Sequence, residues 1–346
     1  MQMEEMTRFE DFSLEYRDRV YKQLLGYLPV VDDPVYNRMI KVYTERKGNY
    51  RRPSYLLLWT ALYGGSIEEA VLPAAAQQAS EDWMLIHDDI MDGNPVRRGR
   101  PAAHVIYGLP KAINAGDGLH AAMWKMAIDA AYSLGGSRGR RYLNKVYDVI
   151  ITTHIGEHFD ASLTADVKDI TKFTIEDYYK SIHAKSAYYS IYGPMQLGAI
   201  IANESEETIS RIPNYGTPAG LAFQITDDIL DCTSTEAVHG KSIGNDVREG
   251  AKTLILYHAV QNASLGDLQR LKEIYSKSRK QKTEDEVEFV LGKFVELGSI
   301  DFSRREAQRL IEEAAKQFEI ETHDMPESMV KKLARLAIGH TVERSK

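Results

Sequence analysis

Asp88-Asp89-Ile90-Met91-Asp92 is the stretch from which the rest of the chain is best interpreted. It ends a segment, from Ser66 onward, whose apolar spacing predicts a helix. At helical pitch Asp88 and Asp92 share one face, where two bare carboxylates repel each other unless a cation lies between them. Oxygen ligands of this kind suit Mg²⁺ or Mn²⁺. A single motif is equally compatible with a solvated acidic helix end.

A second copy of the motif favours the metal interpretation. Asp227-Asp228-Ile229-Leu230-Asp231 has the same spacing and follows the apolar run Ala219–Ile225, about 140 residues along the chain. Two such motifs predict two carboxylate clusters that face one cavity. Three arginines follow the first motif closely: Arg97, Arg98 and Arg100. Hard cations with arginines nearby are what a bound diphosphate requires, because the cations bridge phosphate oxygens and the arginines neutralise the remaining charge.

Composition excludes several classes of protein. The chain has 346 residues, of which 43% are hydrophobic and 27% charged, as in a globular protein with an ample core. Its formal net charge of −7 gives no support to nucleic-acid binding. The one cysteine, Cys232, excludes an internal disulfide. The N-terminus lacks the apolar region of a signal peptide, and no apolar run approaches the roughly 18 residues of a membrane span. We therefore expect no stable membrane insertion and a cytoplasmic location.

Helical periodicity dominates the chain, and strand signals are nearly absent. Residues 1–46 predict two helices. Ser66-Ile67-Glu68-Glu69 has the pattern of a capping box before the first aspartate helix, and Pro73 predicts a kink or restart within that helix. Ile175–Ser190 predicts a further helix. Pro213 and Pro218 predict a break before the second aspartate helix, Ala219–Asp231.

The motifs together resemble the trans-isoprenyl diphosphate synthases (polyprenyl synthases), in particular the archaeal and bacterial geranylgeranyl or farnesyl type. The resemblance extends in order from about residue 48 to 255 and is far more specific than either aspartate motif alone. Besides those motifs it rests on the following stretches: Gly99-Arg100-Pro101-Ala102-Ala103-His104, Lys185-Ser186-Ala187, Phe223-Gln224 and Gly240-Lys241.

The resemblance implies an all-α fold, a single domain over residues 1–346 with ten or more helices around a deep central cavity. It also implies a homodimer, with residues 1–46 as N-terminal helices at the dimer surface. The implied reaction condenses isopentenyl diphosphate with an allylic diphosphate. Mg²⁺ is the implied cofactor, with three ions per site and Mn²⁺ as a substitute, and it assists ionisation of the allylic diphosphate.

Residue by residue, the resemblance assigns metal binding to Asp88, Asp92, Asp227 and Asp231. It assigns the allylic diphosphate to Arg97, Lys185, Ser186, Gln224 and Lys241, with Lys252 as a weaker candidate. Ser186 replaces the usual threonine. The residues expected to carry catalysis are Asp88, Asp92, Asp227, Lys185 and Lys241.

The isopentenyl diphosphate subsite departs from the family at two positions. Arg52 and Arg98 match, but Asn49 stands where the family has a lysine, and Lys47 lies two residues earlier. Glu81 stands where the family usually has a histidine or glutamine. A carboxylate beside a diphosphate is repulsive unless it is protonated or bridged by metal.

Trp83 and Met84 lie five and four residues before Asp88, where the family forms the floor of its chain-elongation pocket. A tryptophan floor implies a short product, C15 to C20, although ordinary core packing also explains an apolar pair. The stretch His154-Ile155-Gly156-Glu157-His158 has the spacing of an inverted zinc-protease motif. We favour core or rim histidines there, because Gly156 and Asp160 match a family segment in which Glu157 replaces a glutamine.

Two alternative functions follow from the altered acceptor subsite. In the first, the protein ionises an allylic diphosphate but uses another acceptor or cyclises the substrate, as a terpene synthase does. In the second, it is a non-catalytic partner subunit that binds diphosphate. The two intact aspartate motifs argue against the second alternative.

Overall fold

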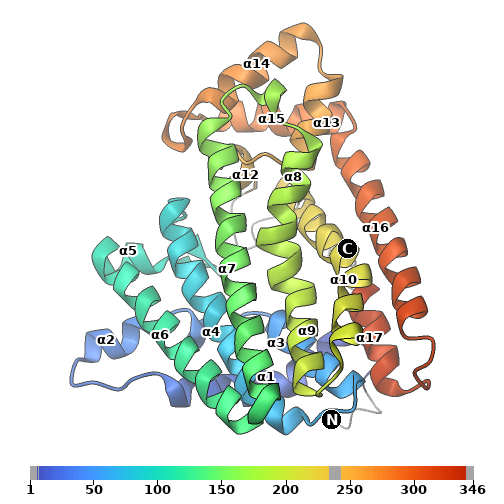
Figure 1. Ribbon diagram of the computed structural model, residues 1–346. Coiled ribbons are helices and arrows are strands. Elements are labelled where there is room, and N and C mark those ends of the chain that lie inside the picture. Colours follow the sequence, from blue (N-terminus) through green and yellow to red (C-terminus); the bar gives the residue numbers. More distant parts are fainter. Residues whose placement is uncertain (1–5, 7, 234–242, 340–346) are drawn as a thin grey trace. The chain divides into compact units, whose positions relative to one another are not determined.

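The computed structural model describes residue 6 and residues 8–233 and 243–339. These residues form two compact units, each of which is described by itself. Figure 1 labels the helices and colours the ribbon along the sequence. Unit 1 contains the described residues up to Val149 together with Ser190–Pro213 and Glu321–Ala337. Unit 2 contains Ile150–Tyr189, Asn214–Ile320 and the described residues from Ile338 onward.

Unit 1 is built around α4 (Ile67–Met91), the helix that ends in the first aspartate motif. Between Ala70 and Ala79 almost every α4 side chain is buried, and five of them are alanines: Ala70, Ala74, Ala75, Ala76 and Ala79. Small side chains let neighbouring helices approach on several sides, and a helix that is apolar all round belongs in a core. Its neighbours are α6 (Leu109–Leu134), α3 (Arg51–Leu62), α1 (Phe9–Tyr27) and α9 (Gly193–Ile201).

The remaining elements of unit 1 are short, apart from parts of two longer helices. They are α2 (Pro34–Met39), β1 (Val96–Arg97), β2 (Arg100–Pro101), α5 (Ala103–Tyr107), α17 (Met329–Gly339), the first part of α7 (Gly136–Asp166) and the start of α10 (Glu206–Thr233). Strands β1 and β2 form an antiparallel hairpin directly after the aspartate motif. Its turn is Arg98-Gly99, where both residues have positive φ, at 53° and 70°. Such turns match the twist of paired strands.

Unit 2 consists of the rest of α7 and α10, a π-helical segment and shorter helices. The helices are α8 (Ile175–Ile182), α12 (Asn245–Glu249), α13 (Leu254–Asn262), α14 (Leu265–Ser276), α15 (Glu284–Glu296) and α16 (Ser299–Glu321). The π-helical segment His183–Tyr192 continues directly from α8. Gly156 of α7 and Gly220 of α10 both approach the backbone of this segment so closely that an added Cβ would clash with it.

The prediction of an all-α bundle of ten or more helices is confirmed, and the hairpin is the one addition among the described residues. Four local predictions differ from the structure. Helix α10 passes through Pro213 and Pro218 without a break. The Ile175–Ser190 helix changes to π geometry at His183. Ser66 makes no side-chain capping hydrogen bond, and the Glu69 carboxylate pairs with Arg138 at 2.9 Å. Helix α4 also continues through Pro73 without restarting.

Candidate active site

The first aspartate motif forms the last turn of α4, with Asp92 as the C-cap. Carboxylates at the C-terminal end of a helix face the negative end of its dipole and therefore need a compensating cation. The β1–β2 hairpin folds back and supplies one. Arg97 Nη2 lies 3.1 Å from Asp88 Oδ2, and Arg97 Nε donates to Asp89 Oδ1 at 2.9 Å. The Asp89 side chain is fully buried, so these contacts take the place of hydrogen bonds to solvent.

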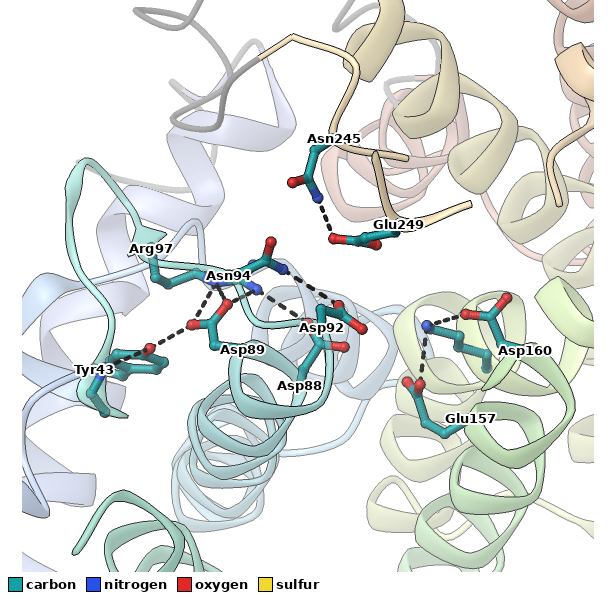
Figure 2. A network of polar contacts seen from close by, with 12 residues as sticks. Tyr43, Asp88, Asp89, Asp92, Asn94, Arg97, Glu157, Asp160, Asn245 and Glu249 are labelled. Carbon is teal, nitrogen blue, oxygen red and sulfur yellow. Dashed lines mark hydrogen bonds and ion pairs between the residues drawn. The ribbon is translucent and has the colours of Figure 1, made fainter. Parts of the chain in front are cut away.

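Asp89 also accepts a hydrogen bond from the hydroxyl of Tyr43, as Figure 2 shows. Burial, together with the Asp89 carboxylate, raises the pKa of Tyr43. The middle aspartate is thus bound to protein groups on both oxygens. Asp88 keeps 24% of its side chain exposed, and Asp92, half-buried, receives a 3.4 Å contact from Asn94 Nδ2. The two outer carboxylates of this motif are therefore the ones with access to a ligand.

The second aspartate motif lies near the end of α10 in unit 2 and repeats this arrangement with different donors. Asp228, 5% exposed, accepts hydrogen bonds of 2.8 Å from Tyr178 Oη and from Gln224 Nε2. Burial raises the pKa of Asp228 above its usual range, and those two donors only partly offset it. Asp227 is half-buried. Asp231 is 3% exposed and accepts the backbone N–H of Asp246 at 3.0 Å, so it is the least accessible of the four predicted metal ligands.

Lys185 lies in the π-helical segment, and two carboxylates of α7 hold its ammonium group. Nζ lies 2.7 Å from Asp160 Oδ2 and 3.0 Å from Glu157 Oε2, the contacts drawn at Glu157 and Asp160 in Figure 2. The neighbouring Ser186 is buried. Lys185 is thus an ammonium group about 30% exposed, with acids on one side. Lys241 lies outside the described residues.

Lys252 is a buried cation in unit 2 that lies close to other lysines. Its side chain is 5% exposed, and Nζ donates to the carbonyl of Gly250 at 2.8 Å. Burial, together with the charges of Lys282 and Lys168, lowers the pKa of Lys252 to about 8.

The predicted acceptor subsite lies in unit 1, and the structure brings three of its four residues together. Glu81 Oε2 lies 3.1 Å from Arg52 Nη1, and Glu81 Oε1 lies 3.4 Å from Arg98 Nη2. Arg52 Nη2 also donates to Ser190 Oγ at 2.8 Å, and Arg98 Nη1 donates to the carbonyl of Tyr43 at 3.0 Å. Glu81 therefore bridges the two guanidinium groups that were predicted to bind a diphosphate.

The fourth residue, Asn49, is exposed. Lys47 makes its contacts elsewhere: Nζ pairs with Asp18 Oδ1 at 2.9 Å and lies 4.4 Å from the ring centroid of Tyr21. In this conformation Lys47 does not replace the missing lysine beside Arg52.

A second acid lies next to Glu81. Asp82 is fully buried and accepts hydrogen bonds from Thr44 Oγ1 at 2.8 Å and from Gln78 Nε2 at 3.1 Å. Burial raises the pKa of Asp82 to about 6, although Arg98 at 3.7 Å opposes the shift. Burial alone would also raise the pKa of Glu81, but the charges of Arg52 and Arg98 outweigh it and hold that pKa below its usual value.

Trp83 and Met84, the predicted floor residues, lie on α4 against α6. Trp83 is 3% exposed, and its ring centroid lies 4.6 Å from that of His120 and 5.7 Å from that of His87. Trp124 Nε1 donates to His120 Nε2 at 2.9 Å, which fixes the orientation of the histidine behind Trp83. Met84 is half-buried. The predicted floor residue Trp83 is thus part of an aromatic cluster with His87 and His120.

Among the described residues, no three His, Cys, Asp or Glu side chains lie close enough together to hold a metal ion. The zinc-protease interpretation of His154 and His158 therefore has no support, and both histidines are exposed on α7. The accessible acids that fit Mg²⁺ by chemistry are Asp88 and Asp92 in unit 1 and Asp227 in unit 2, since all of them offer oxygen ligands.

Sequence reasoning missed Tyr43 and Tyr178, the tyrosines that bind the two middle aspartates. They lie 46 and 50 residues from their partners. No spacing rule links residues that far apart, so only the folded chain shows these contacts.

The fold and the two aspartate motifs define a class of enzymes, the prenyl diphosphate synthases, and comparisons with known proteins agree. A family model described as polyprenyl synthetase matches residues 33–293. The chain belongs to the polyprenyl synthetase family. This membership makes it an enzyme of the prenyltransferase class, and the alternatives of another acceptor or a non-catalytic subunit are not favoured.

Curated relatives agree on the class and differ in the named product. A short chain isoprenyl diphosphate synthase of Methanothermobacter thermautotrophicus is 33% identical over 79% of this chain and 80% of the relative. A geranylfarnesyl diphosphate synthase of Aeropyrum pernix is 32% identical over 86% of this chain and 91% of the relative. A geranylgeranyl diphosphate synthase of Sulfolobus acidocaldarius is 30% identical over 74% and 76%.

Solved structures share the fold. Geranylgeranyl pyrophosphate synthetase from Pyrococcus horikoshii has a TM-score of 0.83 and 28% identity, covering 97% of this chain and 99% of that chain. A geranylgeranyl pyrophosphate synthase from Corynebacterium glutamicum, solved with isoprenyl diphosphate and magnesium, has a TM-score of 0.85, 23% identity and coverage of 97% and 99%. None of the helices among the described residues has the length and apolar character of a membrane span.

Proposed function

We propose that the protein is a short-chain trans-prenyltransferase that joins isopentenyl diphosphate to an allylic diphosphate and releases a C15–C20 prenyl diphosphate. The observation that carries the proposal is the repeated construction of the aspartate motifs. In each motif a tyrosine and a second side chain bind the buried middle carboxylate, while the first carboxylate stays accessible. Fixing the middle carboxylate orients the outer ones toward a ligand.

Asp88, Asp92 and Asp227 are the groups that we propose to hold Mg²⁺. When bound, Mg²⁺ would stabilise the negative charge of the departing diphosphate. Arg97 in unit 1 and Lys185 in unit 2 are the cations that we propose to bind diphosphate and to neutralise charge that develops on it. For Lys185 this requires the ammonium group to share its hydrogen bonds between Asp160, Glu157 and the ligand.

We assign product length to Trp83. Its ring is buried and backed by His120, so it cannot move aside for a growing chain without disturbing α6. Trp83→Ala should shift the product distribution toward chains longer than C20, measured by separating labelled products by length. His104→Ala, a change outside the aromatic stack, serves as the control. An unchanged distribution in a folded Trp83→Ala protein would contradict the assignment.

A homodimer is part of the proposal and is supported by an apolar surface on unit 1. Helices α5 and α6 lie in contact, and their exposed large apolar side chains include Val105, Ile106, Leu109 and Ile113. A second copy of the chain would bury this surface. Sedimentation analysis of the purified protein tests the assembly directly, and a monomer at micromolar concentration would contradict it.

A product assay tests the function. The protein with Mg²⁺ receives C5, C10 or C15 allylic diphosphates, each with and without labelled isopentenyl diphosphate. Label in a C15 or C20 diphosphate is the expected result. Diphosphate release from the allylic substrate without incorporation of label would show that another acceptor is used, and no release from any primer would refute the prenyltransferase proposal.

A further inference from the structure

The Arg52–Arg98 pair already holds an anion that belongs to the protein. The two carboxylate oxygens of Glu81 face different guanidinium groups, at 3.1 Å from Arg52 Nη1 and 3.4 Å from Arg98 Nη2. The three side chains keep between 12% and 21% of their surface exposed, so the cluster borders solvent without being open to it. A carboxylate between two guanidinium groups is the arrangement in which an anionic ligand would also bind.

The arginines have anchors that do not depend on Glu81. Arg52 Nη2 donates to the hydroxyl of Ser190, and Arg98 Nη1 donates to the backbone carbonyl of Tyr43. In addition, Arg98 lies against Gly48 so closely that an added Cβ would clash with the guanidinium group. These neutral contacts would hold both guanidinium groups in place after the carboxylate has left. Glu81, by contrast, extends from the helix α4 on a side chain that can adopt other rotamers.

A second acid shares the charge of this cluster. Asp82 is buried beside Glu81, with one oxygen 3.7 Å from Arg98 Nη1. The two acids offset part of the positive charge of Arg52 and Arg98, to which Arg51 adds. A diphosphate that enters while Glu81 remains would meet a carboxylate at hydrogen-bond range, and the repulsion between like charges would weaken its binding.

We propose that Glu81 is an internal competitor that occupies the Arg52–Arg98 pair, so that the diphosphate of the acceptor binds only by displacing the Glu81 carboxylate. Glu81 then sets the affinity for the acceptor without touching the allylic substrate. A diphosphate displaces a single carboxylate because it offers more charge and more oxygen atoms to two guanidinium forks. The identification of the ligand as isopentenyl diphosphate rests on the proposed function, whereas the competition itself does not.

The first test measures the two Michaelis constants separately. Glu81→Gln keeps the shape of the side chain and removes its charge, and Glu81→His places there a residue that the resembled family uses. We expect Glu81→Gln to lower KM for isopentenyl diphosphate at least about tenfold, with KM for the allylic diphosphate unchanged within twofold. Glu68→Gln is the matched control, since it removes the same charge from the same helix at a surface pair with Arg19.

A double substitution shows whether the effect passes through the arginines. In an Arg98→Gln background, adding Glu81→Gln should change KM for isopentenyl diphosphate much less than it does in the natural sequence. Thermal unfolding of each variant confirms that the protein is folded. If the folded Glu81→Gln protein has an unchanged or higher KM for isopentenyl diphosphate, Glu81 is not a competitor and the proposal is wrong.

A binding measurement tests the competition by Glu81 independently of the proposed prenyltransferase reaction. Calorimetric titration of the natural protein, Glu81→Gln and Glu81→Gln/Arg98→Gln with isopentenyl diphosphate, and in parallel with inorganic diphosphate, needs no turnover. Tighter binding by Glu81→Gln that is lost in the double variant supports the competition even if no labelled product is ever formed. Equal affinities of the natural protein and Glu81→Gln overturn it even if the synthase reaction is established.

Discussion

The two aspartate motifs use the same construction with different charge. In unit 1, the middle carboxylate of Asp89 is bound by Tyr43 and by the guanidinium group of Arg97, which also reaches Asp88. In unit 2, Asp228 is bound by Tyr178 and by the amide of Gln224, both neutral donors. Burial accordingly raises the pKa of Asp228. The first motif therefore carries its own compensating cation, and the second depends more on charge supplied from elsewhere, such as a bound metal ion.

Replacing the first aspartate of each motif should lower kcat more than any other change proposed for the two motifs. Asp88→Asn and Asp227→Asn should each lower kcat about 10²–10³-fold, because each removes a proposed metal ligand. Removal of Mg²⁺ with a chelator should abolish turnover of the natural protein, and added Mg²⁺ should restore it. Steady-state kinetics measure all three, with Asp129→Asn, in a surface pair with Lys125, as the control. If only one motif matters for turnover, the two are not functionally equivalent.

Removing the second donor of each middle aspartate should separate the motifs in stability. Arg97→Gln leaves a buried carboxylate without its cation and should lower the free energy of unfolding by about 3–5 kcal/mol. Gln224→Leu removes a neutral donor and should cost about 1–3 kcal/mol. Denaturant unfolding followed by circular dichroism gives both values. Arg304→Gln, in an exposed pair with Asp301, should change little, and equal losses for Arg97 and Gln224 variants would remove the distinction drawn here.

The buried acid Asp82 should make the stability of unit 1 depend on pH. Because its pKa in the folded protein is raised to about 6, the folded state holds a proton that the unfolded chain has lost. That contribution to stability is fully present below the ordinary pKa of an aspartate, near 4, and is lost as the pH rises through 6.

The loss attributable to Asp82 should be about 2 kcal/mol between pH 4 and pH 7. Asp82→Asn should remove this part of the pH dependence, measured as the difference between the unfolding free energies of the two proteins at several pH values. Parallel curves for the variant and the natural protein would show that Asp82 titrates normally.

A small change in KM for the allylic diphosphate is expected at Lys185, the cation of unit 2 that pairs with Glu157 and Asp160. Lys185 and Glu157 are each about 30% exposed, so their interaction is screened by solvent. Glu157→Gln should lower KM for the allylic diphosphate about two- to threefold and leave kcat nearly unchanged, because Asp160 still orients the ammonium group. Glu68→Gln controls for the charge change. A rise in KM would mean that Glu157 positions Lys185 for the ligand and does not compete with it.

The sequence predicted the helical class and both aspartate helices because periodicity and local motifs encode them. It did not predict that α10 continues through Pro213 and Pro218, since local breaker rules omit the packing that holds a long helix together. Arg97 was predicted as a diphosphate ligand, but its ion pair with Asp89 was not, because that contact depends on the hairpin turn. Glu81 was recognised as unusual from its position, and its contacts with Arg52 and Arg98 became visible only in the folded chain. The roles assigned to these residues remain predictions.

The π-helical segment His183–Tyr192 has a consequence for engineering and for aligning this chain with others. A π-helix contains more residues per turn than an α-helix, so the segment behaves as a stretch into which extra residues have been inserted. Deleting one residue before Lys185 would rotate its side chain by roughly 100° around the axis, which corresponds to one α-helical step. The ammonium group would then turn away from Asp160. A gap placed between His183 and Lys185 in an alignment shifts Lys185 by one position, which corresponds to the same rotation about the helix axis.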